Sequence, residues 1–141
     1  MKQRHAYANL VFHLIFKVAR RQPLIASVDR EQFLNRLIIS KSRELDVYVY
    51  GYGAAEDHVH VLFSSRPSLA LEKYIHDIKG TTAWIWNKEH ERDWGKLAWQ
   101  DGYWITSVTP EGFDRLKTYV DRQREHHVRN ELSQAWETPP D

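Results

Sequence analysis

Regular spacing of hydrophobic residues divides the chain into seven segments. Four are short apolar runs rich in β-branched and aromatic residues, a pattern typical of strands. These predicted strands cover residues 7–17, 47–53, 58–64 and 97–108, the last interrupted by Asp101-Gly102. Three segments repeat their apolar residues at the spacing of helices that bury one face. These predicted helices cover residues 27–45, 67–86 and 111–132.

Turn and capping residues mark the boundaries between the segments. A polar turn over residues 54–57 joins the second and third predicted strands into a hairpin. Pro110 follows Thr109 at the start of the last helix, where proline is favoured because its missing N–H would have no helical partner. Residues 88–96 are expected to form a charged link, and residues 132–141, with two prolines, a frayed tail.

The resulting order of elements is strand, helix, strand, strand, helix, strand, helix. This is the split β-α-β order of ferredoxin-like folds, extended by one C-terminal helix that carries Tyr119. We therefore expect an α+β fold in a single domain, residues 1–141, with an antiparallel sheet covered by helices on one face. The other face must be solvated, covered by a partner subunit, or used for binding.

Composition excludes several classes of protein. The 141 residues, 42% hydrophobic and 28% charged, are typical of a globular domain and not of a disordered or fibrous chain. No apolar run approaches the roughly 20 residues that a membrane-spanning helix needs. The absence of cysteine excludes disulfides, thiolate metal sites and cysteine nucleophiles. Because the first residues do not resemble a signal peptide, we expect a cytoplasmic protein.

The net charge of +1 conceals a strong asymmetry along the chain. Residues 1–43 contain nine lysines and arginines against two acidic residues, a balance of +7, whereas the remaining residues balance to −6. This skew indicates either a surface that faces a polyanion or merely the solvated faces of one strand and one helix.

The segment Asp57-His58-Val59-His60 is the sharpest chemical feature of the sequence. Because strand side chains alternate, His58 and His60 share one face, and two imidazoles one pleat apart can converge on a divalent metal ion. Asp57 can orient one of the rings by accepting a hydrogen bond from it. The alternative is a pair of half-exposed strand histidines that bind nothing, and a third ligand is needed to decide between the two.

The last predicted helix contains a candidate ligand and a candidate nucleophile. Tyr119 and Gln123 are four residues apart and therefore neighbours at the edge of its apolar stripe. Taken alone, they fit a tyrosine at the edge of the core and a solvated glutamine. Combined with His58 and His60, they fit a site in which a metal polarises a phosphodiester and Tyr119 attacks it. The resulting phosphotyrosine would allow rejoining without a nucleotide cofactor.

Three motifs follow one another between residues 57 and 127. They are Asp57-His58-Val59-His60-Val61-Leu62, then Trp99-Gln100-Asp101-Gly102-Tyr103 followed by Ser107-Val108, then Tyr119-Val120-Asp121-Arg122-Gln123 followed by Glu125-His126-His127. In this order and spacing the chain resembles the HUH single-tyrosine transposases of the insertion sequence 200/605 type and the REP-associated tyrosine transposases. One difference is Glu56, where that family usually has proline; it affects the turn and leaves the ligands intact.

The resemblance implies a function in DNA transposition. It implies that His58, His60 and Gln123 bind a divalent ion, Mg or Mn, and that Tyr119 is the nucleophile. It also implies a single-stranded DNA substrate with hairpin ends, a 5′-phosphotyrosine intermediate with a free 3′-hydroxyl, and a homodimer whose sheets join. The candidate phosphate contacts, which would position DNA without reading its sequence, are Lys17, Arg20 and Arg21, with Arg4 and Lys79 as weaker choices.

Two other functions are compatible with the same sequence. One is a ferredoxin-like binder of single-stranded nucleic acid without catalysis, which would use the aromatic residues Tyr48, Tyr50 and Tyr52. The other is a metal phosphodiesterase that uses the histidine pair and an activated water. His5, His13, His76 and His90 have no partners of this kind and are expected to be structural or solvated. Most tryptophans are expected to lie in the core.

Overall fold

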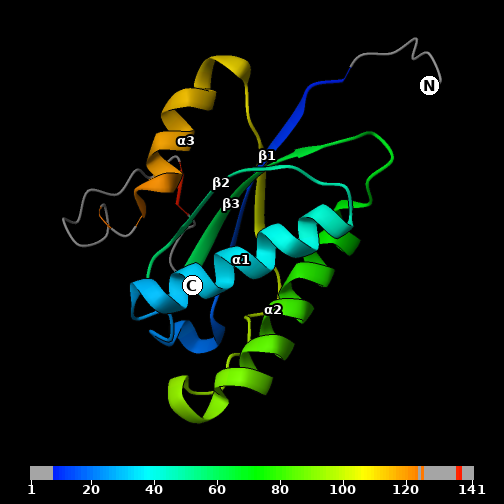
Figure 1. Cartoon of the computed structure of the whole chain (residues 1–141). Coiled ribbons are helices and arrows are strands. Elements are labelled where there is room, and N and C mark those ends of the chain that lie inside the picture. The colour runs from blue at the N-terminus through cyan, green and yellow to red at the C-terminus, as the bar shows by residue number, and fades with distance from the viewer. Residues whose placement is uncertain (1–7, 124, 126–135, 138–141) are drawn as a thin grey trace.

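The structure is a computed structural model that describes residues 8–123, 125 and 136–137. Its strands are β1 (Leu10–Lys17), β2 (Val49–Ala54), β3 (His58–Ser65) and β4 (Trp104–Ser107). Its helices are α1 (Val28–Glu44), α2 (Leu71–Trp94) and α3 (Phe113–Asp121), with short 3-10 turns η1 (Ala19–Arg21) and η2 (Pro110–Gly112). Figure 1 shows these elements, whose order along the chain is the predicted one. No helix within the described ranges is long and apolar enough to cross a membrane.

The four strands form one antiparallel sheet in the order β2-β3-β1-β4. This is the strand order of a ferredoxin-like fold, so the predicted α+β class is confirmed. β1 and β3 lie side by side at the centre, with Ile15 opposite His60 and Lys17 opposite His58. Because paired residues point to the same face, this register decides which β1 side chains neighbour the two histidines.

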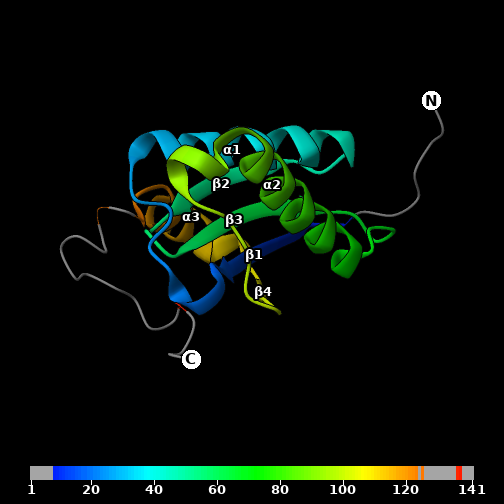
Figure 2. The ribbon, with the colours of Figure 1, turned by 90° about the horizontal axis from the view of Figure 1, so that it is seen from below.

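α1 and α2 lie together on one face of the sheet (Figures 1 and 2). α1 begins after Ser27, whose hydroxyl accepts a hydrogen bond from the backbone N–H of Arg30 and so caps the first turn. The main core fills the space between these helices and the sheet, and its buried members include Phe16, Leu34, Ile38, Val59, Val61, Phe63, Tyr74, Ile78 and Trp86. Burial of each such side chain favours folding by about 1.5–3 kcal/mol.

α2 is longer than predicted. It continues to Trp94, so the charged link expected over residues 88–96 is wrong for residues 88–94. The rings of Trp86 and Trp94 hold this extension because both pack edge-on against Phe33 of α1, with ring centres 6.2 and 5.3 Å apart. Gly95, whose φ is 92°, then ends the helix in a conformation that glycine adopts without strain.

α3 packs on the opposite face of the sheet, which the sequence left open. Leu116 and Val120 of α3 contact Val11 of β1 and Leu62 of β3 in a second, smaller core. Alternation along β3 turns Leu62 away from the main core, toward the face that carries the two histidines. The predicted last helix extended to residue 132, but residue 124 and residues 126–132 lie outside the described residues.

Gly53 allows the end of α3 to approach the sheet closely. It lies opposite His60 in the pairing of β2 with β3. A Cβ atom at Gly53 would be only 1.7 Å from the backbone oxygen of Val120 and 2.9 Å from Cβ of Gln123. The contact between α3 and β2 therefore depends on the absence of a side chain at this position.

Candidate active site

β3 directs its two histidines toward the end of α3. His58 is 3% exposed and His60 0%, so they are not the half-exposed strand histidines of the alternative hypothesis, in which the pair binds nothing. They point away from Val59 and Val61, as the alternation of strand side chains predicted. Buried imidazoles need polar partners, and both rings have them.

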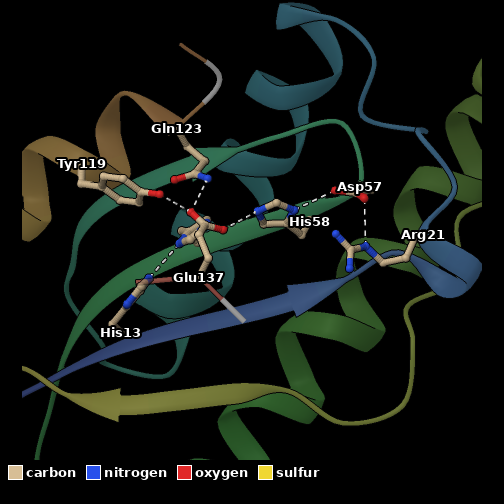
Figure 3. Close-up of polar contacts among 8 residues, drawn as sticks. His13, Arg21, Asp57, His58, Tyr119, Gln123 and Glu137 are labelled. Atoms are coloured by element: carbon tan, nitrogen blue, oxygen red, sulfur yellow. Dashed lines mark hydrogen bonds and ion pairs between the residues drawn. The ribbon is translucent and has the colours of Figure 1, made fainter. Parts of the chain in front are cut away.

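Asp57 orients the His58 ring through a hydrogen bond, as Figure 3 shows. Nδ1 of His58 donates a 2.7 Å hydrogen bond to Oδ1 of Asp57, and Nε of Arg21 donates a 2.9 Å bond to Oδ2. Burial favours a neutral Asp57, but the bonds from His58 and Arg21 outweigh it and lower the pKa of Asp57 to about 2. Burial likewise disfavours protonation of His58, yet its bonds to Asp57 and Glu137 raise its pKa. Since Nδ1 of His58 is engaged by Asp57, Nε2 faces the interior of the site.

His13 of β1 is the corresponding partner of His60. Its Nε2 lies 2.8 Å from Nδ1 of His60, and the two ring planes are nearly parallel, with their centres 5.0 Å apart. Burial, and next the neighbouring His60, lower the pKa of His13 to about 3, so the ring is neutral at neutral pH. The prediction that His13 has no partner of this kind is wrong. The alternation of β1 placed His13 on one face, but only the strand register brings it to His60.

Tyr119 and Gln123 approach the histidines from the C-terminal end of α3. The ring of Tyr119, 5% exposed, is centred 6.3 Å from that of His60, and Gln123 is fully buried. Both residues face the sheet where Gly53 permits close contact. The structure thus brings together His58, His60, Tyr119 and Gln123, the four residues that the sequence singled out.

Glu137, from the tail that was expected to fray, lies among these four side chains (Figure 3). Its Oε1 is 3.2 Å from Nε2 of His58 and 3.3 Å from Nε2 of His60. Its Oε2 accepts hydrogen bonds from the Tyr119 hydroxyl at 2.5 Å and from Nε2 of Gln123 at 2.8 Å. The adjacent Trp136 packs its ring on Tyr119, with centres 4.9 Å apart. No pattern in the sequence signalled Glu137, because it belongs to no periodic segment.

The donor atoms at this point suit a divalent metal ion. His58, His60 and Glu137 offer ligand atoms that all lie within 4.8 Å of one another. Oε1 of Gln123 is buried and has no hydrogen-bond partner among the residues that the structure describes, which leaves an amide oxygen available as a ligand. Imidazole nitrogens together with carboxylate or amide oxygens suit ions such as Mn, Zn and Fe, whereas Mg sites are usually richer in oxygen. The residues present therefore fit the implied ion without identifying it.

The candidate phosphate contacts have different surroundings. Lys17 ends β1 opposite His58, and Arg20 follows on the exposed surface of η1. Arg21 forms its ion pair with Asp57 at the edge of the site. Nζ of Lys79 instead donates to the backbone carbonyls of Gln100 and Gly102, at 2.8 and 2.9 Å, and so holds the loop before β4. Arg4 lies outside the described residues.

Tyr48, Tyr50 and Tyr52, in and just before β2, do not form one open stacking surface. Tyr52 packs against the main core, whereas Tyr50 packs against the α3 core with its ring centre 5.0 Å from that of Phe113. Tyr48 is exposed, with 65% of its surface accessible. This arrangement removes the main support for a nucleic-acid binder that stacks bases on these three rings.

Comparison with known proteins agrees with the sequence motifs. A family model described as "Transposase IS200 like" matches residues 6–123. The chain is 26% identical over 131 residues to the ISDra2 transposase TnpA of Deinococcus radiodurans, covering 89% of this chain and 92% of that protein.

Two solved structures share the fold. One is a Deinococcus radiodurans protein described as a candidate transposase, with a TM-score of 0.69, 18% identity, and coverage of 88% of this chain and 98% of the other. The second is a REP-associated tyrosine transposase bound to a REP hairpin, with a TM-score of 0.64, 13% identity, and coverage of 94% and 76%. At these identities the two structures support the fold alone.

Proposed function

Starting from the fact that this chain belongs to the IS200-like transposase family and is a DNA-cleaving transposase, we propose how it works. It is a metal-dependent endonuclease and strand transferase that cuts and rejoins single-stranded DNA. Tyr119 is the nucleophile, and His58, His60 and Gln123 are the metal ligands. The observation that carries this proposal is the convergence of the Tyr119 hydroxyl, the Gln123 amide and both Nε2 atoms on one carboxylate.

The chemistry follows from the nucleophile. A divalent ion, Mg or Mn, bound by His58, His60 and Gln123 would polarise the scissile phosphate and neutralise its charge. The Tyr119 oxygen forms a bond to phosphorus as the phenol loses its proton, and the bond from phosphorus to the 3′-oxygen breaks. The 3′-oxygen takes up a proton and leaves as a free hydroxyl, while the 5′-phosphate stays on the protein. The reverse of this step rejoins the strand without a nucleotide cofactor.

The substrate we propose is single-stranded DNA with hairpin ends. Support comes from the structural relative that is bound to a REP hairpin and from the basic residues Lys17 and Arg20 beside the site. Lys17 lies opposite His58 in the sheet, so DNA held there would pass close to the candidate metal ligands. A homodimer is also proposed, and light scattering would test it.

A covalent-adduct assay tests the mechanism. The protein is incubated with Mg or Mn and a labelled hairpin oligonucleotide from the DNA that flanks its own gene, and the products are separated on a denaturing gel. We expect a protein–DNA band with the unmodified chain and no such band with Tyr119→Phe. The exposed Tyr48→Phe, which also removes one hydroxyl, is the matched control and should form the band normally.

The same gel separates the proposal from its rivals. Released DNA fragments without a covalent band would indicate a phosphodiesterase that uses water. Binding without cleavage under either metal would indicate a non-catalytic binder. A covalent band that persists in Tyr119→Phe would contradict the assignment of the nucleophile, and normal cleavage by His58→Ala or Gln123→Ala would contradict that ligand.

A further inference from the structure

The two candidate metal-binding histidines are each held at Nδ1 by a different kind of partner. His58 donates to the carboxylate of Asp57, which can only accept. His60 faces the imidazole of His13, which can accept or donate depending on which nitrogen carries its hydrogen. The hydrogen position is therefore determined at His58 but has two possible arrangements at His60.

The geometry between His13 and His60 is that of one N–H···N hydrogen bond. The two nitrogens are 2.8 Å apart, and His13 is 1% exposed, so water does not compete for the contact. A neutral pair shares a single hydrogen along this line. If the hydrogen is on Nδ1 of His60, Nε2 of His60 has a lone pair toward the site. If it is on Nε2 of His13, neutral His60 must carry its own hydrogen on Nε2, which prevents that atom from binding a metal.

We propose that His13 is a positioning residue for the metal site: it accepts the hydrogen of Nδ1 of His60 and so presents the Nε2 lone pair of His60 to the metal. This inference rests on the proposed function, in which His60 is a ligand. His13 acts through His60 and does not touch the ion, just as Asp57 acts through His58. The planes of the two rings are inclined by only 18°, so the hydrogen bond also fixes the plane of the His60 ring.

The alternative arrangement has a use in the same site. With its hydrogen on Nε2, the His60 ring turns an N–H toward Oε1 of Glu137, which lies 3.3 Å away. The two arrangements differ in the tautomer of both rings, so the neutral pair can present either an N–H to the carboxylate or a lone pair to a metal at this position. A side chain at residue 13 that accepts a hydrogen bond from Nδ1 of His60 favours the metal-binding arrangement. A side chain that can neither accept nor donate a hydrogen bond stabilises neither arrangement.

Metal titration without DNA tests the inference on the full chain. His13→Gln keeps a polar group that can accept near the position of Nε2, whereas His13→Phe keeps an aromatic ring but has no acceptor. We expect His13→Phe to bind Mn²⁺ about 10–100-fold more weakly by calorimetry, the usual effect of losing such a partner. The Mn²⁺ affinity of His13→Gln should stay within about threefold of that of the unmodified chain, a much smaller loss than the one expected for His13→Phe. His90→Phe is the control, because His90 stacks on Trp94 far along α2 and should bind Mn²⁺ normally.

Three outcomes separate the possible failures. Equal Mn²⁺ affinity in His13→Phe and the unmodified chain, with both folded by circular dichroism, overturns the role of His13 while leaving the metal site intact. Equal weakening in His13→Gln and His13→Phe also overturns it, because the acceptor then does not matter. If the unmodified chain binds no Mn²⁺, the proposed metal site fails and the inference fails with it.

A measurement on the unmodified protein covers the case in which His13→Phe does not fold. The chain is labelled with ¹⁵N and loaded with Zn²⁺, a diamagnetic probe, and the imidazole nitrogens are observed by NMR. We expect the shared hydrogen on Nδ1 of His60, with a scalar coupling across the bond to Nε2 of His13. A hydrogen on Nε2 of His13, or no coupling between these two nitrogens, overturns the proposal.

Discussion

Replacement of Gly53 by alanine tests the contact that brings α3 to the candidate active site. The added Cβ would lie 1.7 Å from the backbone oxygen of Val120, and neither backbone can rotate away as a side chain could. To restore a separation of about 3.0–3.4 Å, α3 must withdraw by roughly 1.3–1.7 Å, an overpacking that costs about 1–3 kcal/mol. Tyr119 and Gln123 lie on the part of the chain that must move, so both side chains should move away from His58 and His60.

The expected effects are therefore twofold. Urea unfolding should show a loss of about 1–3 kcal/mol in the free energy of unfolding. A displacement of Tyr119, the proposed nucleophile, by more than about 1 Å should slow formation of the covalent DNA adduct by about 100-fold in a single-turnover assay. The slower rate should persist at temperatures where the variant remains fully folded.

The same substitution at two other glycines provides matched controls. At Gly51 a Cβ would approach Oδ1 of Asp121 at 2.9 Å, the end of a side chain that can move, so Gly51→Ala should cost less than Gly53→Ala. At Gly80, inside α2, a Cβ would have no atom within 4 Å, and Gly80→Ala should stabilise the protein by about 0.5–1 kcal/mol. If Gly53→Ala matches the unmodified chain in both stability and adduct rate, α3 does not approach β2 as described.

Three further predictions concern other parts of the molecule. Trp86→Ala should lower the free energy of unfolding, measured in urea, by about 3–5 kcal/mol, because it removes a buried ring and its 2.8 Å hydrogen bond to the carbonyl of Gly95. A smaller loss would mean that the ring does not stabilise the end of α2. Arg20→Ala should reduce the slope of log binding constant against log salt for single-stranded DNA by about 0.7, the value for one lost phosphate contact. Lys79→Ala should leave this slope nearly unchanged, because that ammonium is bound to backbone carbonyls; equal effects of the two variants would contradict this distinction. The pKa of His13 is lowered from 6.5 to about 3, so between these pH values the unfolded chain binds more protons than the folded chain. The contribution of neutral His13 to the free energy of unfolding is therefore fully present above pH 6.5 and is lost as the pH falls toward 3. Urea unfolding at several pH values should show a shallower loss of stability with falling pH for His13→Gln than for the unmodified chain.

Much of the site was predictable because its main components are local in sequence. Alternation along β3 placed His58 and His60 on one face, and the four-residue spacing of Tyr119 and Gln123 made them neighbours on a helix. The order of strands and helices also followed from hydrophobic periodicity and turn residues. These features depend on backbone geometry within a few residues, which is the same wherever the segment lies.

Other features depended on contacts between distant segments. The length of α2 could not be predicted because its last turns are charged on the solvent side and are held by Phe33 of another helix. Helical periodicity indicated an apolar stripe on α3 but not which face of the sheet it covers. That choice depends on the second core and on the space left at Gly53, both of which exist only once the strands have paired.

By itself, the sequence determined the fold class and the family, and it predicted four residues that the structure brings together in the candidate site. Only the tertiary structure decided that His13 contacts His60, that Arg21 pairs with Asp57, and that Glu137 lies among the candidate ligands. The physical reason is that strand register and the return of the chain near residue 137 are set by long-range packing. A hydrogen-bond partner 47 residues away leaves no periodic trace in the sequence, so it becomes visible only when the two strands lie side by side.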